Sequence, residues 1–395
     1  MLRDTLSAGL LSLLLATPSS AVLLWVTSYN DHMVTSLDLK GRELKTVAKS
    51  TDCGSEPTWL SLNKDKSVLY CLNEGWGGES SITSYKTLAN GTLETLEILP
   101  VLKSAASSTL YGPNKSGLAV AHYDTSTFST FSVGDGTELA LVQNATYTLA
   151  EPGPVPDRQA APHPHDAVLD PTGKFILVPD LGADLVRVYA VESGSLAWTE
   201  LDPIKVAPGS GPRHGAFAVV GQNTFFYLLN ELSNTITGYR VTYNAESAVE
   251  FAQIFEISSH GAGGSVPEGA LAAEIEVSPD QRFVLISSRL ENSLTIPNFD
   301  KTNSTRLPSD PIVSLKIDQR SGELSLVQEA PAGGRIPRGF SLNKAGTLVA
   351  SALQGDNRVV VIERNVNTGK LGKIVAWATV GEGEGNGPSY VLFNE

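Results

Sequence analysis

Short apolar runs alternate with polar turns along this chain, and they recur in a fixed order. The clearest copy has an apolar run at 165–170, a polar turn at 171–174, a second apolar run at 175–180 and a third at 185–189. The turn contains Pro-Thr-Gly, which suits a tight reversal because proline presets φ and glycine accepts a positive φ. The unit therefore predicts three consecutive antiparallel strands.

The same unit recurs at intervals of roughly 50 to 65 residues, a period typical of propeller blades. First strands are expected to begin at Pro57, His165, Gly215, Ala273, Arg338 and Pro388, and a weaker copy lies around 117–123. The 36 glycines and 22 prolines supply the turns that many short strands require. Seven copies predict seven blades.

The last copy, at 388–393, is a first strand with no strands after it. Apolar runs at 22–26 and 34–39 can pair with it. A blade that combines both ends of the chain closes the ring and removes open sheet edges. We therefore predict an all-β fold, in which residues 22–395 form a single seven-bladed β-propeller domain closed by N- and C-terminal strands in one blade.

The first residues have the pattern of a secretory signal peptide. Arg3 precedes an apolar stretch at 6–16, and small residues at 18–21 provide a cleavage site after Ala21. A buried strand or helix is the alternative for residues 1–21. N-glycosylation sequons, which agree with a secretory route, begin at Asn90, Asn114, Asn144 and Asn303. We therefore expect a secreted glycoprotein.

Charge and hydropathy limit the classes of molecule that this protein is expected to bind. The chain has 29 Lys and Arg against 42 Asp and Glu, a net charge of −13, which argues against a nucleic-acid partner and an anionic membrane surface. No apolar run after the signal region approaches the ~18 residues of a membrane span. A few arginines can still attract a small anion locally. We expect a small-molecule substrate, and the sequence leaves the oligomeric state open.

The blade pattern predicts where chemistry gathers. In an antiparallel blade, the start of strand one and the end of strand two lie at the same rim. Polar residues at those positions are His163, His165, Asp166, Arg213, His214, Glu274 and Arg338 at the starts, and Asn73, Glu74, His122, Tyr123, Asp180, Asn230, Glu231, Arg289 and Gln354 at the ends. One mouth of the central channel should therefore hold a site of histidines, arginines and carboxylates.

The same rule brings Cys53 and Cys71 to one rim of one blade, so we predict a disulfide between them, with two separate buried thiols as the alternative. A disulfide is permitted in a secretory compartment. His32, His163 and His260 are expected on the surface or in loops.

The tightest predicted group comes from three consecutive blades. His165 and Glu231 can divide acid and base work, and Arg213 and Arg289 can hold a carboxylate or an oxyanion. Substrate-binding residues around them are expected at His122, Tyr123, His214, Glu274 and Arg338. Structural alternatives are an Arg213–Glu231 pair, a Glu274–Arg289 pair and an interblade bridge from Arg338.

No cofactor motif is evident. No Gly-x-Ser-x-Gly elbow appears, and no Walker or Rossmann glycine pattern follows a predicted strand. We expect no cofactor and no metal, with a metal held by His163 and His165 as the alternative.

Several motifs in order resemble the lactonase-type seven-bladed propeller family, which includes fungal carboxy-cis,cis-muconate lactonizing enzymes and bacterial 6-phosphogluconolactonases. They are His-Pro-His-Asp at 163–166, Asp-Pro-Thr-Gly-Lys at 170–174, Gly-Pro-Arg-His at 211–214, Leu-Asn-Glu-Leu-Ser-Asn at 229–234 and Glu-Val-Ser-Pro-Asp at 276–280. The resemblance implies a metal-independent site at the channel mouth, with roles falling on His165, Glu231, Arg213 and Arg289.

Three functions fit these features. The first is a cyclase or lactonase acting on a small organic acid or lactone. The second is a secondary-metabolite cyclase that catalyses dehydration or pericyclic, Diels–Alder-type ring closure, to which secretory targeting would be equally suited. The third is a non-catalytic ligand-binding propeller. A small arginine-lined pocket would favour the first function, and an apolar pocket the second. The segment 297–311 is a candidate cover for the mouth.

Overall fold

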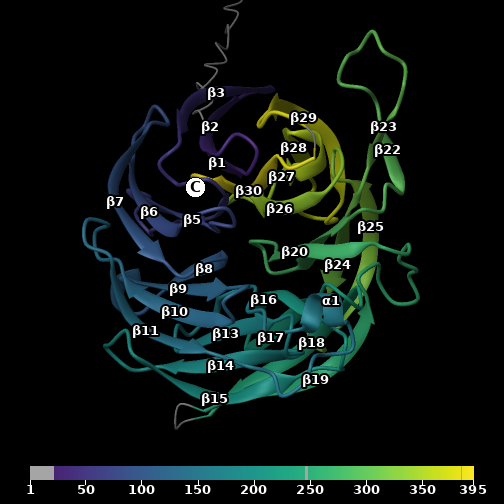
Figure 1. Cartoon of the computed structure of the whole chain (residues 1–395). Coiled ribbons are helices and arrows are strands. Elements are labelled where there is room, and N and C mark those ends of the chain that lie inside the picture. Colours follow the sequence, from purple (N-terminus) through teal and green to yellow (C-terminus); the bar gives the residue numbers. More distant parts are fainter. Residues whose placement is uncertain (1–21, 245–247, 384) are drawn as a thin grey trace, which may run out of the picture.

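A computed structural model describes residues 22–244, 248–383 and 385–395, and the predicted signal peptide lies outside this range. Seven four-stranded antiparallel sheets are arranged around a common axis, and one further hairpin stands apart from them (Figure 1). The prediction of an all-β, seven-bladed propeller is confirmed. Among the described residues, no helix is both long and apolar enough to cross a bilayer.

The blades follow one another along the chain. Blade 1 contains β1 (Val22–Ser28), β2 (Met33–Lys40), β3 (Glu43–Ser50) and β30 (Pro388–Phe393). Blade 2 contains β4 (Pro57–Leu62), β5 (Val68–Asn73), β6 (Ser80–Thr87) and β7 (Leu93–Val101). Blade 3 contains β8 (Ala105–Tyr111), β9 (Gly117–His122), β10 (Thr127–Ser132) and β11 (Ala140–Thr146). Blade 4 contains β12 (Val168–Leu169), β13 (Phe175–Asp180), β14 (Leu185–Val191) and β15 (Trp198–Lys205).

The second half of the ring repeats the plan. Blade 5 contains β16 (Pro212–Val220), β17 (Asn223–Asn230), β18 (Thr235–Tyr243) and β19 (Val249–Ser258). Blade 6 contains β20 (Leu271–Val277), β21 (Phe283–Arg289), β24 (Pro311–Ile317) and β25 (Leu324–Pro331), interrupted by the hairpin β22 (Leu294–Ile296) and β23 (Leu307–Ser309). Blade 7 contains β26 (Pro337–Leu342), β27 (Leu348–Leu353), β28 (Arg358–Arg364) and β29 (Leu371–Thr379). The short helices are η1 (Pro113–Lys115), α1 (Pro156–Gln159) and η2 (Gln354–Asp356).

Ring closure occurs as predicted. The C-terminal strand β30 is the innermost strand of blade 1 and pairs antiparallel with β1, where Trp25 lies opposite Leu392 and Val26 opposite Val391. Side chains of this blade share an apolar cluster with blade 7, for example Leu24 with Val361. The two ends of the described chain are therefore locked into one sheet.

The first strand of blade 3 was not identified from the sequence, whereas its second strand ends at His122, as expected. The apolar run at 117–123 is its second strand, β9, and its first strand is β8 at Ala105–Tyr111. The sequence of β8, Ala-Ala-Ser-Ser-Thr-Leu-Tyr, begins with five small residues, so it lacks the bulky apolar pattern that marks the other first strands. Small side chains fit there because β8 lies at the centre of the ring, packed against β4.

Turn chemistry fixes the register of the blades. The Asp170 carboxylate accepts hydrogen bonds from the backbone N–H groups of Thr172, Lys174 and Phe175 at 2.8–2.9 Å. Asn63 and Asn343 have the same role in blades 2 and 7. These side chains replace backbone partners and so stabilise the reversal between strands one and two.

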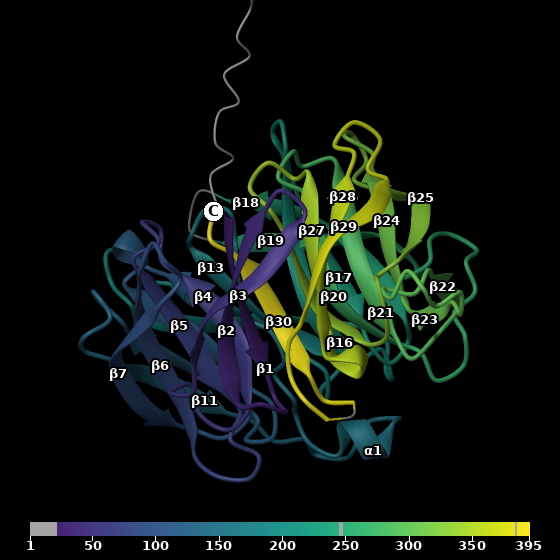
Figure 2. The same ribbon diagram turned by 90° about the horizontal axis from the view of Figure 1, so that it is seen from above.

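The segment at 297–311 does not cover the mouth. The β22–β23 hairpin projects sideways from the edge of blade 6 in both views (Figure 2). Phe299, within this hairpin, packs against Arg358 and Trp377 of the neighbouring blade, with ring centroids of Phe299 and Trp377 4.9 Å apart. These contacts hold the hairpin against the outside of the ring.

The predicted disulfide between Cys53 and Cys71 is present, with Cα atoms 5.9 Å apart. Cys53 lies in the connection from blade 1 to blade 2, and Cys71 lies in β5. The bond therefore ties the closing blade to the next one.

Replacing both cysteines by alanine is expected to lower the free energy of unfolding by about 2–4 kcal/mol, because the bond closes a loop of 18 residues. Urea denaturation followed by tryptophan fluorescence measures the change. Wild-type protein unfolded in dithiothreitol is the matched control and should lose the same amount. An unchanged midpoint in both would contradict the prediction.

Candidate active site

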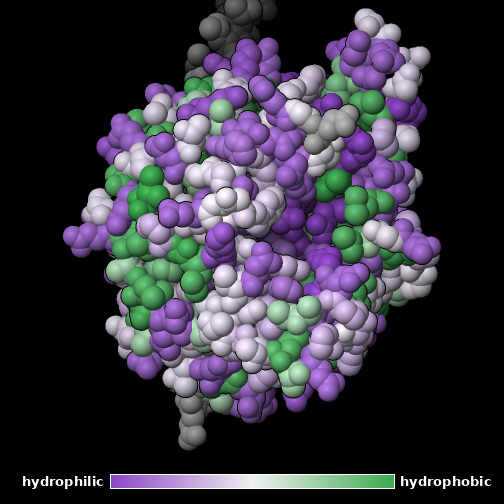
Figure 3. All heavy atoms as spheres, in the orientation of Figure 1, coloured by the Kyte–Doolittle hydropathy of each residue, from purple (hydrophilic) through white to green (hydrophobic). Residues whose placement is uncertain are grey.

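The rim predicted to carry the chemistry forms as expected. Strand starts and strand ends pair directly across it, as Pro57 does with Asn73, Pro212 with Asn230, and Pro164 with Asp180. This face is turned toward the viewer in Figure 3, where a hollow with mostly hydrophilic walls opens near its centre.

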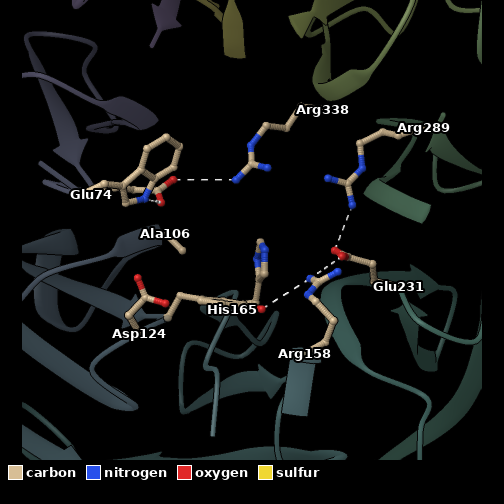
Figure 4. A pocket seen from close by; sticks show the side chains of 10 residues that line it. Glu74, Ala106, Asp124, Arg158, His165, Glu231, Arg289 and Arg338 are labelled. Atoms are coloured by element: carbon tan, nitrogen blue, oxygen red, sulfur yellow. Dashed lines mark hydrogen bonds and ion pairs between the residues drawn. The ribbon is translucent and has the colours of Figure 1, made fainter. Parts of the chain in front are cut away.

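The hollow contains a cavity of about 240 Å³ (Figure 4). Its walls come from six consecutive blades, blades 2 to 7, and from α1. They are formed by Glu74, Trp76, Ala106, Tyr123, Asp124, Arg158, His165, Glu231, Arg289 and Arg338. A second void of about 10 Å³ lies beneath, shares Ala106, His165 and Arg338 with the first, and is too small for a substrate. We call these the mouth pocket and the lower void.

Glu231 is the centre of an ion cluster in the wall of the mouth pocket. Its Oε1 atom lies 2.6 Å from a nitrogen of Arg158, and its Oε2 atom lies 2.9 Å from Arg213 and 3.0 Å from Arg289. Arg289 and Arg158 both point toward Glu231 in Figure 4. The predicted Arg213–Glu231 pair is present, and Arg289 pairs with Glu231 rather than with Glu274. One carboxylate holds three guanidinium groups, so the cluster keeps a net positive charge.

The arginines keep Glu231 ionised. Burial opposes the charge on this carboxylate, but Arg289, Arg213 and Arg158 outweigh burial and lower its pKa from 4.5 to about 2. A lowered pKa means that the cluster contributes fully to stability above about pH 4.5, and this contribution is lost as the pH falls toward 2. With so low a pKa, Glu231 is a weak base at neutral pH. Its contacts are those of a buried counter-charge that holds the three arginines in position.

Arg338 lies on the other side of the mouth pocket. Its guanidinium approaches Glu74 at 3.7 Å, so blade 7 bridges to blade 2 across the ring. Glu74 is held more firmly by the Tyr29 hydroxyl, which donates to it at 2.6 Å, and by the Trp76 indole N–H. The side chain of Arg338 remains 22% exposed, which leaves donors free for an anion in the pocket.

His165 forms part of the pocket wall, and its ring is fixed by neighbours. Its backbone N–H donates to the Pro179 carbonyl at 2.9 Å, which extends the first strand of blade 4 to the mouth. Tyr123 contacts the ring edge-on at 5.5 Å between centroids. The Nδ1 atom lies 3.2 Å from Nε2 of His214, which leaves Nε2 of His165 for the pocket.

His214 and Glu274 lie in the lower void rather than in the mouth pocket. His214 Nδ1 lies 2.8 Å from Oε1 of Glu274, and both residues are buried. Burial and the positive charge of Arg213 lower the pKa of His214 to about 3, and they also lower the pKa of His165 well below its usual range. Both imidazoles are therefore neutral. The expectation that His214 and Glu274 bind substrate at the mouth does not agree with their position.

Tyr123 and Arg338 line the mouth pocket as expected, but His122 does not. Its side chain is fully buried, with Nδ1 at 2.9 Å from the Leu102 carbonyl, because its strand position turns it into the blade. Sequence reasoning missed Arg158, Trp76 and Asp124 as pocket residues. Arg158 lies on α1, within a long proline-rich connection that has no strand pattern to place it.

The remaining histidines lie in connections, as expected, but one of them is not on the surface. His260 is 3% exposed and lies between Glu291 at 2.9 Å and Glu329 at 3.0 Å. These carboxylates come from neighbouring segments that fold over the loop, so its sequence context alone does not reveal the burial. His32 is exposed, and His163 is partly buried with its ring stacked on Tyr123.

Residues 23–384 match the protein family described as a lactonase with a seven-bladed β-propeller. The chain belongs to this lactonase family. It is 32% identical over 339 residues to an Arthroderma benhamiae protein named "Probable 6-phosphogluconolactonase", a match that covers 85% of this chain and 80% of that protein. A 6-phosphogluconolactonase of Bacillus subtilis is 28% identical over 338 residues, covering 85% of this chain and 87% of the other.

Solved structures agree on the fold of this lactonase-family propeller. The periplasmic gluconolactonase of Pseudomonas aeruginosa superposes with a TM-score of 0.78 over 95% of this chain and 99% of its own, at 24% identity. At this identity the likeness supports the architecture alone. Within the described parts of the chain, no group of three or more His, Cys, Asp or Glu side chains is arranged to hold a metal ion.

Replacing Glu231 by glutamine is expected to destabilise this lactonase-family protein at pH 7 by about 3–5 kcal/mol, because three arginines lose their buried counter-charge. Glu200→Gln is the matched control, because its carboxylate is 42% exposed and only 3.8 Å from Arg187, so the change should stay within about 1 kcal/mol. Urea midpoints measure both. Equal midpoints for the two variants would show that the cluster is not structural.

Proposed function

We propose that this protein is a lactone hydrolase whose substrate is a small lactone carrying an anionic group, such as a sugar-acid lactone with a carboxylate or phosphate. The observation that carries the proposal is the mouth pocket itself. A neutral histidine lies there beside Arg289 and Arg338, which are held by the carboxylates of Glu231 and Glu74 respectively. The family membership and the names of the relatives support the same reaction class.

The size and polarity of the pocket favour this function over a secondary-metabolite cyclase. A cavity of about 240 Å³ admits a small acid or lactone and is below the ~300–1,000 Å³ of sites for drug-sized ligands. Charged side chains make up most of the wall, so a large apolar intermediate would lose water from the arginines without replacing its hydrogen bonds.

The residues divide the chemistry as follows. His165, with its Nε2 atom toward the pocket, acts as general base and takes a proton from a water that attacks the lactone carbonyl. The guanidinium of Arg289 or Arg338 donates hydrogen bonds to the oxyanion that develops on that carbonyl. The other arginine holds the anionic group of the substrate and fixes the ring in place. Return of the proton to the ring oxygen opens the lactone to a hydroxy acid.

His165→Asn is expected to lower kcat for lactone hydrolysis about 10²–10⁴-fold with little change in KM, since the base is lost while the arginines remain. The panel consists of glucono-1,5-lactone, its 6-phosphate and a muconolactone, each corrected for spontaneous hydrolysis, together with a muconate as the substrate for cyclisation. His32→Asn is the control, because His32 is exposed and lies outside the pocket.

The results separate the candidate functions. Hydrolysis lost in His165→Asn and retained in His32→Asn supports the proposal. Cyclisation of a muconate without lactone hydrolysis would identify the cyclase direction of the family chemistry. Binding of these compounds, unchanged in His165→Asn and without turnover, would leave a binding propeller and reject the enzyme.

We also infer that the protein is exported and glycosylated. The signal-peptide pattern at 1–21 supports export, and the asparagines of all four sequons are exposed: Asn90, Asn114, Asn144 and Asn303. Expression in a eukaryotic host should give a secreted chain that begins at Val22 and loses mass on treatment with an N-glycosidase. Asn→Gln changes at the four sites provide the control. A protein retained in the cell with Met1 intact would contradict the inference.

A further inference from the structure

A chain of three buried side chains runs downward from the mouth pocket. His165 belongs to blade 4, His214 to β16 of blade 5 and Glu274 to β20 of blade 6. Nδ1 of His165 lies 3.2 Å from Nε2 of His214, and Nδ1 of His214 lies 2.8 Å from Oε1 of Glu274. Trp59 contacts His214 edge-on at 5.6 Å between ring centroids. Both imidazoles are thus held in line with the carboxyl group.

A proton resting on His165 would be costly. The ring is buried and has Arg213, Arg338 and Arg289 near it, so an imidazolium would add a positive charge to a site that already has an excess. His165 is therefore a weak base unless its second proton is transferred to another group. The hydrogen-bonded chain ends on a carboxyl group, Glu274, where an added proton neutralises a negative charge instead of adding a positive one.

We propose that His165, His214 and Glu274 form a proton relay, in which Glu274 stores the proton that His165 takes from the attacking water. The proposal rests on the function proposed above and assigns positioning and proton-accepting roles to His214 and Glu274. Glu274 does not touch the mouth pocket, so it acts through His214.

Each step conserves protons. Water adds to the lactone carbonyl, and its proton passes to Nε2 of His165. The Nδ1 proton of His165 passes to Nε2 of His214, and the Nδ1 proton of His214 passes to Glu274. Collapse of the tetrahedral intermediate breaks the bond between the carbonyl carbon and the ring oxygen. The relay then runs backward, and Nε2 of His165 returns the proton to that oxygen. Both rings stay neutral throughout.

The surroundings of Glu274 suit a proton store. Burial raises its pKa to about 8, although Arg213 and the backbone N–H of Ile275 favour the carboxylate. Arg338 also favours the charged form. Glu274 in turn raises the pKa of Glu276, and the charges of Glu276, Glu274 and Asp166 together raise the pKa of Tyr390. Oε2 of Glu274 has no hydrogen-bond partner in the described structure, so no donor stabilises a negative charge on this oxygen.

The hydrogen-bonded chain of His165, His214 and Glu274 therefore has two protonation states, and both imidazole rings are neutral in each of them. Below about pH 8, Glu274 is protonated and both rings carry their proton on Nε2. Above it, Glu274 is a carboxylate and both rings carry their proton on Nδ1, which leaves Nε2 of His165 free to accept. We expect kcat/KM to rise with pH up to about 8 and then level off.

Glu274→Gln tests the relay, because glutamine keeps the size and the acceptor oxygen for His214 but cannot take a proton. We expect kcat to fall at least about 100-fold with KM within about twofold, and the rise with pH to disappear. Glu276→Gln is the matched control: this acid lies two residues along β20, and its carboxylate accepts from the Leu342 N–H at 3.0 Å outside the relay. Wild-type kcat in Glu274→Gln, or an equal loss in Glu276→Gln, would overturn the relay.

A second measurement separates the relay from the reaction. Histidine ¹⁵N NMR of the wild-type protein should show both rings exchanging their proton from Nε2 to Nδ1 together near pH 8, and neither ring should do so in Glu274→Gln. If the wild type hydrolyses no lactone, the proposed function fails, and this spectrum still decides the relay. Rings that change separately, or that still change in Glu274→Gln, would overturn it.

Discussion

The pairing of β1 with β30 is the constraint on which the rest of the structure depends. Each blade is buried on both faces by its neighbours, so the ring is stable only when it is complete. Closure also sets where the innermost strands begin. Because the mouth-pocket residues lie at those beginnings and at the facing ends of the second strands, in blades 2 to 7, the geometry of the mouth pocket depends on a contact between β1 and β30.

Charge balance is the second constraint at the centre of the ring. Arg158, Arg213 and Arg289 converge from different segments and would repel one another in a buried wall without Glu231. The cluster leaves an excess of positive charge, which attracts an anionic substrate and at the same time depresses the basicity of His165. The features that favour substrate binding thus weaken the base unless its proton can leave.

The separation of the mouth pocket from the lower void allows the site to combine an excess of positive charge with a histidine base. The mouth pocket presents His165, Arg289 and Arg338 to a small molecule, and the lower void keeps His214 and Glu274 away from water. Burial affects the two carboxyl groups differently because their partners differ. Glu231 has three arginines as partners and stays charged, whereas Glu274 has a neutral histidine and tends to be protonated.

The sequence by itself determined the repeat, the number of blades, the closing strands, the disulfide and the rim at which polar residues gather, because strand alternation and turn chemistry are local properties of the chain. It placed His165, Glu231, Arg289 and Arg338 at the mouth for the same reason. Only the tertiary structure decided that Arg158 reaches Glu231, 73 residues away, and that His214 and Glu274 lie below the pocket. Depth and pairing depend on how the blades tilt around the axis, and no local pattern encodes that.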